Sequence, residues 1–107
     1  MSKGYLSLSA ASVLRAVSNG YGYGFDIMDA TGLPSGTVYP ALRRMEDAGL
    51  VTSRWEHSAV AQGEQRPARK YYELSKLGER ALTEAMDRYR LTGSSRAPLS
   101  RPSTAKR

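Results

Sequence analysis

The sequence predicts a mainly α-helical fold with a small β-hairpin: a winged helix-turn-helix followed by a C-terminal dimerisation helix. Three observations predict it: two short helix patterns before a three-residue turn, a change to strand periodicity after residue 50, and a last helix with a broad apolar face. The 107 residues suffice for one small domain. We expect the winged helix-turn-helix at 5–74, the dimerisation helix at 75–91 and a basic, disordered tail at 92–107.

The first two helices are marked by their ends. Residues 8–18 place their apolar side chains mostly on one face, and Gly20 follows as a helix terminator. Residues 24–31 form a second short helix, which Gly32 is suited to end. The turn that follows, "LPS", leads directly into a third helix, so these segments have the outline of a helix-turn-helix.

The third helix has a thin and basic outer side. Apolar residues at helical spacing put its core side on Val38, Ala41, Leu42 and Met45. The opposite side carries Gly36, Pro40, Arg43 and Asp47. Gly36 and Pro40 add little bulk there, so this side can approach another surface closely.

The start of this helix offers groups that suit phosphate. Its free N–H groups and partial positive charge attract anions, and the hydroxyls of Ser35 and Thr37 add donors. Tyr39 adds a phenol, and Arg43 and Arg44 follow where they can contact bases or phosphates. Either Ser35 or Thr37 fits the N-cap, and the sequence does not decide between them. We therefore expect the helix to enter the major groove of double-stranded DNA with its N-terminus first.

After residue 50 the sequence alternates as a strand does. The stretch 51–57, "VTSRWEH", and the stretch 69–74, "RKYYEL", are the two strand candidates. Gly63 and Pro67 mark the segment between them as a basic loop. Together these parts form a β-hairpin wing.

The aromatic residues of this hairpin have structural interpretations. One of Tyr71 and Tyr72 is expected to pack inward and the other to lie on the sheet surface. Trp55 is expected in the core or at a subunit interface. As the single tryptophan, it is also the candidate contact for an apolar effector. His57 is expected to be a strand-end residue.

Ser75 begins the last helix, whose apolar side covers about half of its circumference. A winged helix-turn-helix of this size covers only part of such a face, and an exposed remainder indicates an interface. A two-fold dimer would place two recognition helices roughly 34 Å apart, one DNA turn, on a near-palindromic operator. The predicted interface consists of Leu77, Ala81, Leu82, Ala85, Met86 and Tyr89.

The composition excludes several classes of protein. Without cysteine there is no disulfide, thiolate metal site or cysteine nucleophile, and one histidine cannot form a cluster. The acidic pairs Asp26/Asp29 and Glu46/Asp47 have no partner base or nucleophile, so we interpret them as solvated helix faces. We expect no catalytic residue, no metal and no cofactor. The sequence contains no long apolar run and no signal peptide, so we expect a cytoplasmic protein without a membrane partner.

The charge is uneven along the chain. The net charge is +6, and residues 92–107 contribute four basic residues and no acid. Residues 1–91 hold twelve basic and ten acidic residues, a balance of +2, so their positive charge matters where it gathers. It gathers at Arg43 and Arg44 and again at Arg66, Arg69 and Lys70.

Two motifs resemble a known family. The run "YGYGFDIMDATGLPSGTVYPALRRMEDAGLVTSRW" and the element "RPARKYYELSKLGERAL" are similar to the PadR-like family of bacterial transcription regulators, and the resemblance covers residues 8–90. It implies a winged helix-turn-helix and homodimerisation through the C-terminal helix. It also implies that most members are repressors and that a small ligand releases some of them. Only a 16-residue tail follows Leu91, so we expect a short-type member without the extra helical domain of long ones.

The resemblance also implies roles for individual residues. Tyr23 matches a tyrosine that touches the DNA backbone, and Arg66, Arg69 and Lys70 match the wing. Tyr21 departs from the pattern, because many relatives have histidine or a basic residue there. The residues that match the DNA-reading helix are Ser35, Thr37, Tyr39, Pro40 and Arg43.

Two hypotheses follow. The first is a sequence-specific DNA-binding regulator, a homodimeric repressor that is either constitutive or released by a small hydrophobic effector. The second is a winged-helix module for protein–protein contact, with incidental basic groups, no operator and partner binding that does not depend on salt. Two adjacent arginines alone would fit a solvated helix face. Beside a bare helix face and a basic wing, they favour DNA.

Overall fold

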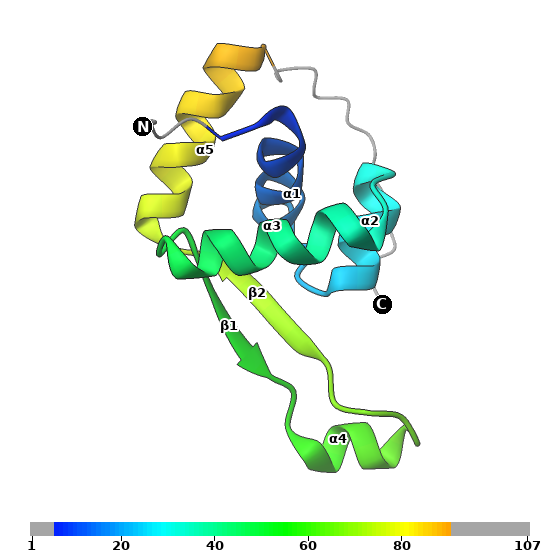
Figure 1. The fold of residues 1–107 in the computed structure, drawn as a ribbon. Coiled ribbons are helices and arrows are strands. Elements are labelled where there is room, and N and C mark those ends of the chain that lie inside the picture. The colour runs from blue at the N-terminus through cyan, green and yellow to red at the C-terminus, as the bar shows by residue number, and fades with distance from the viewer. Residues whose placement is uncertain (1–5, 91–107) are drawn as a thin grey trace.

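The computed structural model describes residues 6–90 of the chain (Figure 1). The elements in chain order are α1 (Leu8–Ser18), α2 (Gly24–Thr31), α3 (Ser35–Asp47), β1 (Val51–Trp55), α4 (Ser58–Gly63), β2 (Lys70–Leu74) and α5 (Lys76–Tyr89). The strands form one antiparallel hairpin within this range. The predicted fold class, mainly α with a small hairpin in a winged helix-turn-helix, is confirmed. The predicted tail at 92–107 lies outside the described residues.

The core forms around α1, which packs against α2, α3, α5 and β2. In Figure 1, α3 crosses in front of α1, with α2 on one side and α5 on the other. Burying an aliphatic side chain of this size stabilises the fold by roughly 1.5–3 kcal/mol. The largest fully buried side chains are Val13, Leu14, Ile27, Val38, Leu42 and Val51.

Capping groups fix where the helices begin and end. The Ser7 hydroxyl accepts a hydrogen bond from the backbone N–H of Ala10 (3.1 Å) at the start of α1. Gly32 ends α2 in the left-handed conformation, with φ of 74°. The Ser75 hydroxyl accepts from the Gly78 N–H (3.0 Å) at the start of α5. The same hydroxyl donates to the carbonyl of Gly49 (2.6 Å), which ties the start of α5 to the end of α3.

The start of α3 differs from both sequence alternatives. Pro34, rather than Ser35 or Thr37, is the N-cap, because its extended backbone lets its carbonyl accept from the N–H groups of Thr37 (2.9 Å) and Val38 (3.0 Å). Pro40 therefore stands at the sixth helical position. It cannot donate to the carbonyl of the residue four positions earlier, but this side of α3 is exposed, so water can bind that carbonyl.

The hairpin is joined to the helical body at its base. Its register runs from the pair Val51 and Leu74 to the pair Trp55 and Lys70. The backbone N–H of Tyr72 also donates to the carbonyl of Gly22 (2.8 Å), beside an isolated bridge between residues 23 and 71. The segment before α2 thus extends the sheet and holds the wing against the helix-turn-helix.

The connection between the strands is not the simple loop that the sequence predicted, because it contains α4. His57 caps this helix: its Nδ1 accepts from the Ala59 N–H (3.4 Å). Ala61, a residue of α4, is the buried one of this helix. Gly63, expected as a breaker, is the last helical residue, and the turn comes at Gln65, which has a φ of 58°. Figure 1 shows α4 at the far end of the hairpin.

Helix α5 leaves the base of the hairpin and runs back along α1 (Figure 1). It starts in close contact with the carbonyl of Leu50, and only a glycine fits there, because a Cβ on Gly78 would collide with that carbonyl. At its other end, the Tyr89 hydroxyl donates to the carbonyl of Leu6 (2.6 Å). The helix ends at Tyr89, and Arg90 adopts a left-handed conformation.

Candidate nucleic-acid interface

The outer side of α3 is open, as the sequence predicted. Gly36, Pro40 and Arg43 are all exposed. A Cβ built on Gly36 would meet no atom within 4 Å. Arg43 and Arg44 project from the same helix, and neither guanidinium group forms a hydrogen bond or an ion pair with any part of residues 6–90. Two unneutralised guanidinium groups on a surface without bulk can approach a polyanion closely.

The first turn of α3 presents its backbone to solvent. The first N–H groups of any helix lack intrahelical acceptors and carry a partial positive charge. Ser35 is exposed and Thr37 is half-buried, so the two predicted hydroxyl donors stand beside these N–H groups. This arrangement can hold a phosphate oxygen.

Tyr39 lies at the edge of α3, where it also has a packing role. Its ring fills the space next to Gly24, where a Cβ would collide with it, so the two residues set how closely α2 and α3 approach. The side chain is still 41% exposed. Partial burial, followed by the nearby Tyr23 and Tyr72, raises the pKa of Tyr39 above its usual value. The phenol is therefore protonated at neutral pH and can donate a hydrogen bond.

Arg66, a predicted wing contact, forms ion pairs inside the wing. Its guanidinium donates to both carboxylate oxygens of Glu56 (2.6 and 2.9 Å) and to Glu64 (3.1 Å). The hydrogen bonds from Arg66 hold the pKa of Glu56 below its usual value. These bonds tie the chain after α4 to the end of β1. A DNA contact by Arg66 remains a prediction, and it would compete with these acids.

Arg69 joins the wing to the start of α2. Its guanidinium carbon lies 4.5 Å from the centre of the Tyr23 ring, and its backbone N–H donates to Glu56 (3.2 Å). The Tyr23 ring also contacts Phe25 (5.6 Å between ring centres) and Tyr71 (5.9 Å). Tyr23 is half-buried in this cluster and is the N-cap residue of α2.

Lys70 and Glu46 attach the wing to α3. The Ser53 hydroxyl donates to Glu46 (2.5 Å), and the ammonium group of Lys70 lies 3.6 Å from the other carboxylate oxygen. The bond from Ser53, and then the charge of Lys70, lower the pKa of Glu46. The prediction that Glu46 belongs to a solvated face is wrong, because the wing folds back against this end of α3. The other members of the predicted solvated pairs, Asp26, Asp29 and Asp47, are exposed.

The hairpin aromatics divide between core and surface. Tyr72 is buried and Tyr71 is half-buried, as expected. Trp55 is 66% exposed, so the expectation that it packs in the core of the chain is wrong. It is the last residue of β1, at the end of the strand pairing farthest from the base of the hairpin.

The predicted interface on α5 is partly occupied by the core of the chain itself. Leu82 and Ala85 are buried against the rest of the chain, and the residues that keep accessible surface are Leu77, Ala81, Met86 and Tyr89. Leu77 is 47% exposed. These four side chains remain available to a second molecule.

Within residues 6–90, two further kinds of site are absent. No group of histidine, cysteine, aspartate or glutamate side chains in this range is placed to hold a metal ion. None of the helices in the same range is long and apolar enough to cross a bilayer.

A comparison with family models decides which proteins this chain is related to. The model of the PadR-like transcriptional regulators matches residues 13–84. The chain belongs to the PadR-like family. Members of this family are transcription regulators that bind DNA, and the family is not one of enzymes.

Solved structures agree with this assignment. The smu.1704 protein of Streptococcus mutans UA159 has a TM-score of 0.66 and 26% identity, over 85% of this chain and 86% of its own. A PadR family transcription regulator from Clostridium difficile R20291 has a TM-score of 0.67 and 25% identity, over 80% and 91%. A PadR-like transcription factor from Bacteroides fragilis has a TM-score of 0.64 and 26% identity, over 78% and 81%. A comparison with curated protein sequences gave no match.

Proposed function

We propose that this PadR-like chain is a homodimeric repressor that binds a near-palindromic operator, with α3 of each subunit in the major groove. The observation that carries the proposal is the outer side of α3. Gly36 and Pro40 leave it without bulk, and Arg43 and Arg44 have no partner among residues 6–90. Such a surface suits the groove of a duplex, where close approach and positive charge are both needed.

The contacts in this proposal divide by type. The N-terminus of α3, with Ser35 and Thr37, binds a backbone phosphate. Arg43 reads a base edge. The commonest contact of this kind is a bidentate pair of hydrogen bonds from arginine to guanine. Arg44 and the phenol of Tyr39 contact phosphates at the two edges of the helix. On the rest of the chain, the proposed backbone contacts are Tyr23, Arg66, Arg69 and Lys70.

The dimer in this proposal forms through α5. Leu77, Ala81, Met86 and Tyr89 offer it an apolar surface, and Leu82 and Ala85 support that surface from inside each subunit. A two-fold axis through α5 would set the two copies of α3 roughly 34 Å apart, so that both can enter the same side of a duplex.

Release by a small hydrophobic effector completes the proposal. The exposed ring of Trp55 offers a flat surface on which such a compound can stack. Fluorescence of Trp55, the single tryptophan of the chain, reports the binding of a compound directly. A compound that shifts this signal and also lowers operator affinity is an effector.

Selection of bound sequences from random DNA tests the proposal. We expect a two-fold symmetric consensus with half-sites about one helical turn apart, bound by a dimer. On this consensus, log Kd should depend on log salt concentration with a slope of about 0.9 per phosphate contacted. Placed before a reporter gene, it should lower expression when the protein is present. Selection without enrichment, or binding that salt does not weaken, would contradict the proposal and favour a protein–protein module.

A further inference from the structure

Trp55 and Lys70 form a pair on one face of the wing. They are opposite each other in the hairpin register, and the Lys70 ammonium lies 5.8 Å from the centre of the indole ring. Side chains alternate between the two faces of a strand, so this pair shares its face with the next pair but one, Ser53 and Tyr72. Ser53 is bonded to Glu46 on α3. The face with Trp55 and Lys70 is therefore the one that turns toward α3.

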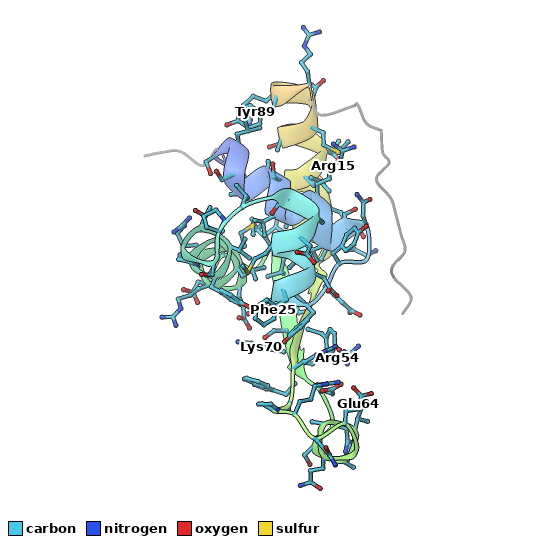
Figure 2. All side chains as sticks on the ribbon, turned by 90° about the vertical axis from the view of Figure 1, so that its right-hand side faces the viewer. Arg15, Phe25, Arg54, Glu64, Lys70 and Tyr89 are labelled. Carbon is cyan, nitrogen blue, oxygen red and sulfur yellow. The ribbon has the colours of Figure 1, made fainter. Side chains whose placement is uncertain are left out.

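This face of the wing meets one edge of α3, and that edge lies next to the outer side of α3. Tyr39 and Glu46 are seven residues apart, so they lie along one edge of the helix. Glu46 bonds to the wing there, and Arg43 stands one turn earlier on the adjacent outer side. Figure 2 shows Lys70 and Arg54 on opposite sides of the hairpin, with Lys70 on the side of α3. A duplex seated on α3 would thus meet the Lys70 side of the wing and not the Arg54 side.

The environment of Trp55 fits a polyanion with apolar surface. The indole is 66% exposed, and its neighbour Lys70 is a cation that is paired with Glu46 at 3.6 Å, so a phosphate bound by Lys70 would share it with that acid. The acids at this end of the wing, Glu56 and Glu64, are both paired with Arg66. The wing therefore presents no unpaired acid beside the ring, and a phosphate is not repelled there.

A dimer contact does not explain this exposure. The apolar surface proposed for the dimer is on α5, and Figure 1 shows α5 and the far end of the hairpin extending in opposite directions from the body. Trp55 is at the end of β1, on the hairpin side.

We propose that Trp55 packs its indole against the sugar–phosphate backbone of the operator next to the groove that α3 enters, while Lys70 binds the adjacent phosphate. This inference rests on the proposed function, because it takes α3 as the helix in the groove. The ring covers deoxyribose, and its N–H can donate to a phosphate oxygen. Trp55 is then a backbone contact that holds the wing in place and does not read sequence.

Titration of the selected operator into the full-length protein tests the contact through Trp55 fluorescence. We expect a saturating change in intensity or emission wavelength at one half-site per subunit. Trp55→Ala should weaken operator binding roughly tenfold, the scale of a buried tryptophan contact, and Trp55→Phe less. Because the lost contact is not ionic, neither variant should alter the salt slope. Lys70→Ala should reduce that slope by about 0.9, the value for one phosphate.

The matched control is Arg54→Ala. It removes a cation from the residue next to Trp55 on β1, whose side chain lies on the other face of the wing. It should leave the fluorescence change in place and lower the salt slope less than Lys70→Ala does. Thermal unfolding of each variant checks that the wing still folds, and the exposure of Trp55 predicts an unchanged midpoint for Trp55→Phe.

The results separate the two proposals. If Trp55→Ala and Trp55→Phe bind the operator as the wild type does, while Arg43→Ala loses affinity, the wing contact is wrong and the function of α3 stands. An operator that binds tightly without any change in Trp55 fluorescence also overturns the wing contact and leaves the function of α3 intact. If selection enriches no operator, and Arg43→Ala binds DNA as the wild type does, the proposed function itself fails.

Discussion

The outer side of α3 and the wing are both basic in sequence, but their charges have different environments. Arg43 and Arg44 have no partner among residues 6–90, whereas Arg66 is held by Glu56 and Glu64, and Lys70 by Glu46. A count of basic residues treats the two regions alike. The structure teaches that Arg43 and Arg44 on α3 keep their charges without a partner among residues 6–90, while much of the charge in the wing holds the wing itself together. Mutation of the two regions should therefore have different consequences.

Replacement of Arg43 should have the largest effect on binding. Arg43→Ala is expected to cost roughly 1–3 kcal/mol of operator affinity if the arginine reads a guanine, with no loss of stability, because the side chain is exposed and unpaired. Arg80→Ala removes the same charge from an exposed position on α5 and is the control. Gel shifts with both variants measure the difference. Equal losses would mean that only overall charge matters.

Replacement of Arg66 should affect the wing before it affects DNA. Arg66→Gln removes the ion pairs of Glu56 and Glu64, and Glu56 keeps the hydrogen bond from the Arg69 backbone N–H. Backbone amides around α4 should therefore exchange hydrogen faster, while those of α1 and α3 stay protected. Operator affinity should fall less than for Arg43→Ala. The double variant Glu56→Gln with Arg66→Gln should recover part of the affinity. A loss as large as that of Arg43→Ala, with an intact wing, would mean that Arg66 matters mainly through its proposed DNA contact and not through its ion pairs in the wing.

Acid should loosen the wing by a smaller and reversible amount. The folded wing lowers the pKa of both Glu46 and Glu56 below their usual 4.5. A depressed carboxylate pKa stabilises the fold above the unfolded value, and this stabilisation disappears as the pH falls through the folded value. Wing protection should therefore be constant from neutral pH down to about 5 and decline below the usual pKa. Hydrogen exchange of β1 and β2 measures it. The variant Glu46→Gln with Glu56→Gln should lose this dependence.

Local patterns predicted the helix-turn-helix well and the wing less well. The bounds of α1 and α2 match the sequence prediction, because their termini depend on nearby residues such as Gly20 and Gly32. The thin side of α3 was also readable, since helical spacing alone puts Gly36 opposite Val38. Helix α4 was missed because Gly63 resembles a breaker. Glu56 and Glu64, which lie on either side of α4, and the nearby Arg66 were a sequence signal for ion pairs across this segment.

Contacts between distant segments left no local signal. Nothing near Glu46 in sequence indicates that Ser53 and Lys70 will fold back onto it. The collision that keeps residue 24 a glycine depends on the ring of Tyr39, which belongs to another helix. Trp55 was expected in the core or at a subunit interface, and its exposure within the chain follows from its place at the end of β1, away from the base of the hairpin.

The most direct test of the central claim is to thicken the outer side of α3 without disturbing the fold. Gly36→Leu adds bulk where the structure has open space, and glycine is a poor helix former, so the unfolding free energy should stay equal or rise by about 0.5–1 kcal/mol. Thr83→Leu, on the exposed side of α5, is the matched control. We predict that Gly36→Leu abolishes operator binding while its melting temperature is unchanged or higher, and that Thr83→Leu binds as the wild type does. Normal operator binding by folded Gly36→Leu would contradict the account.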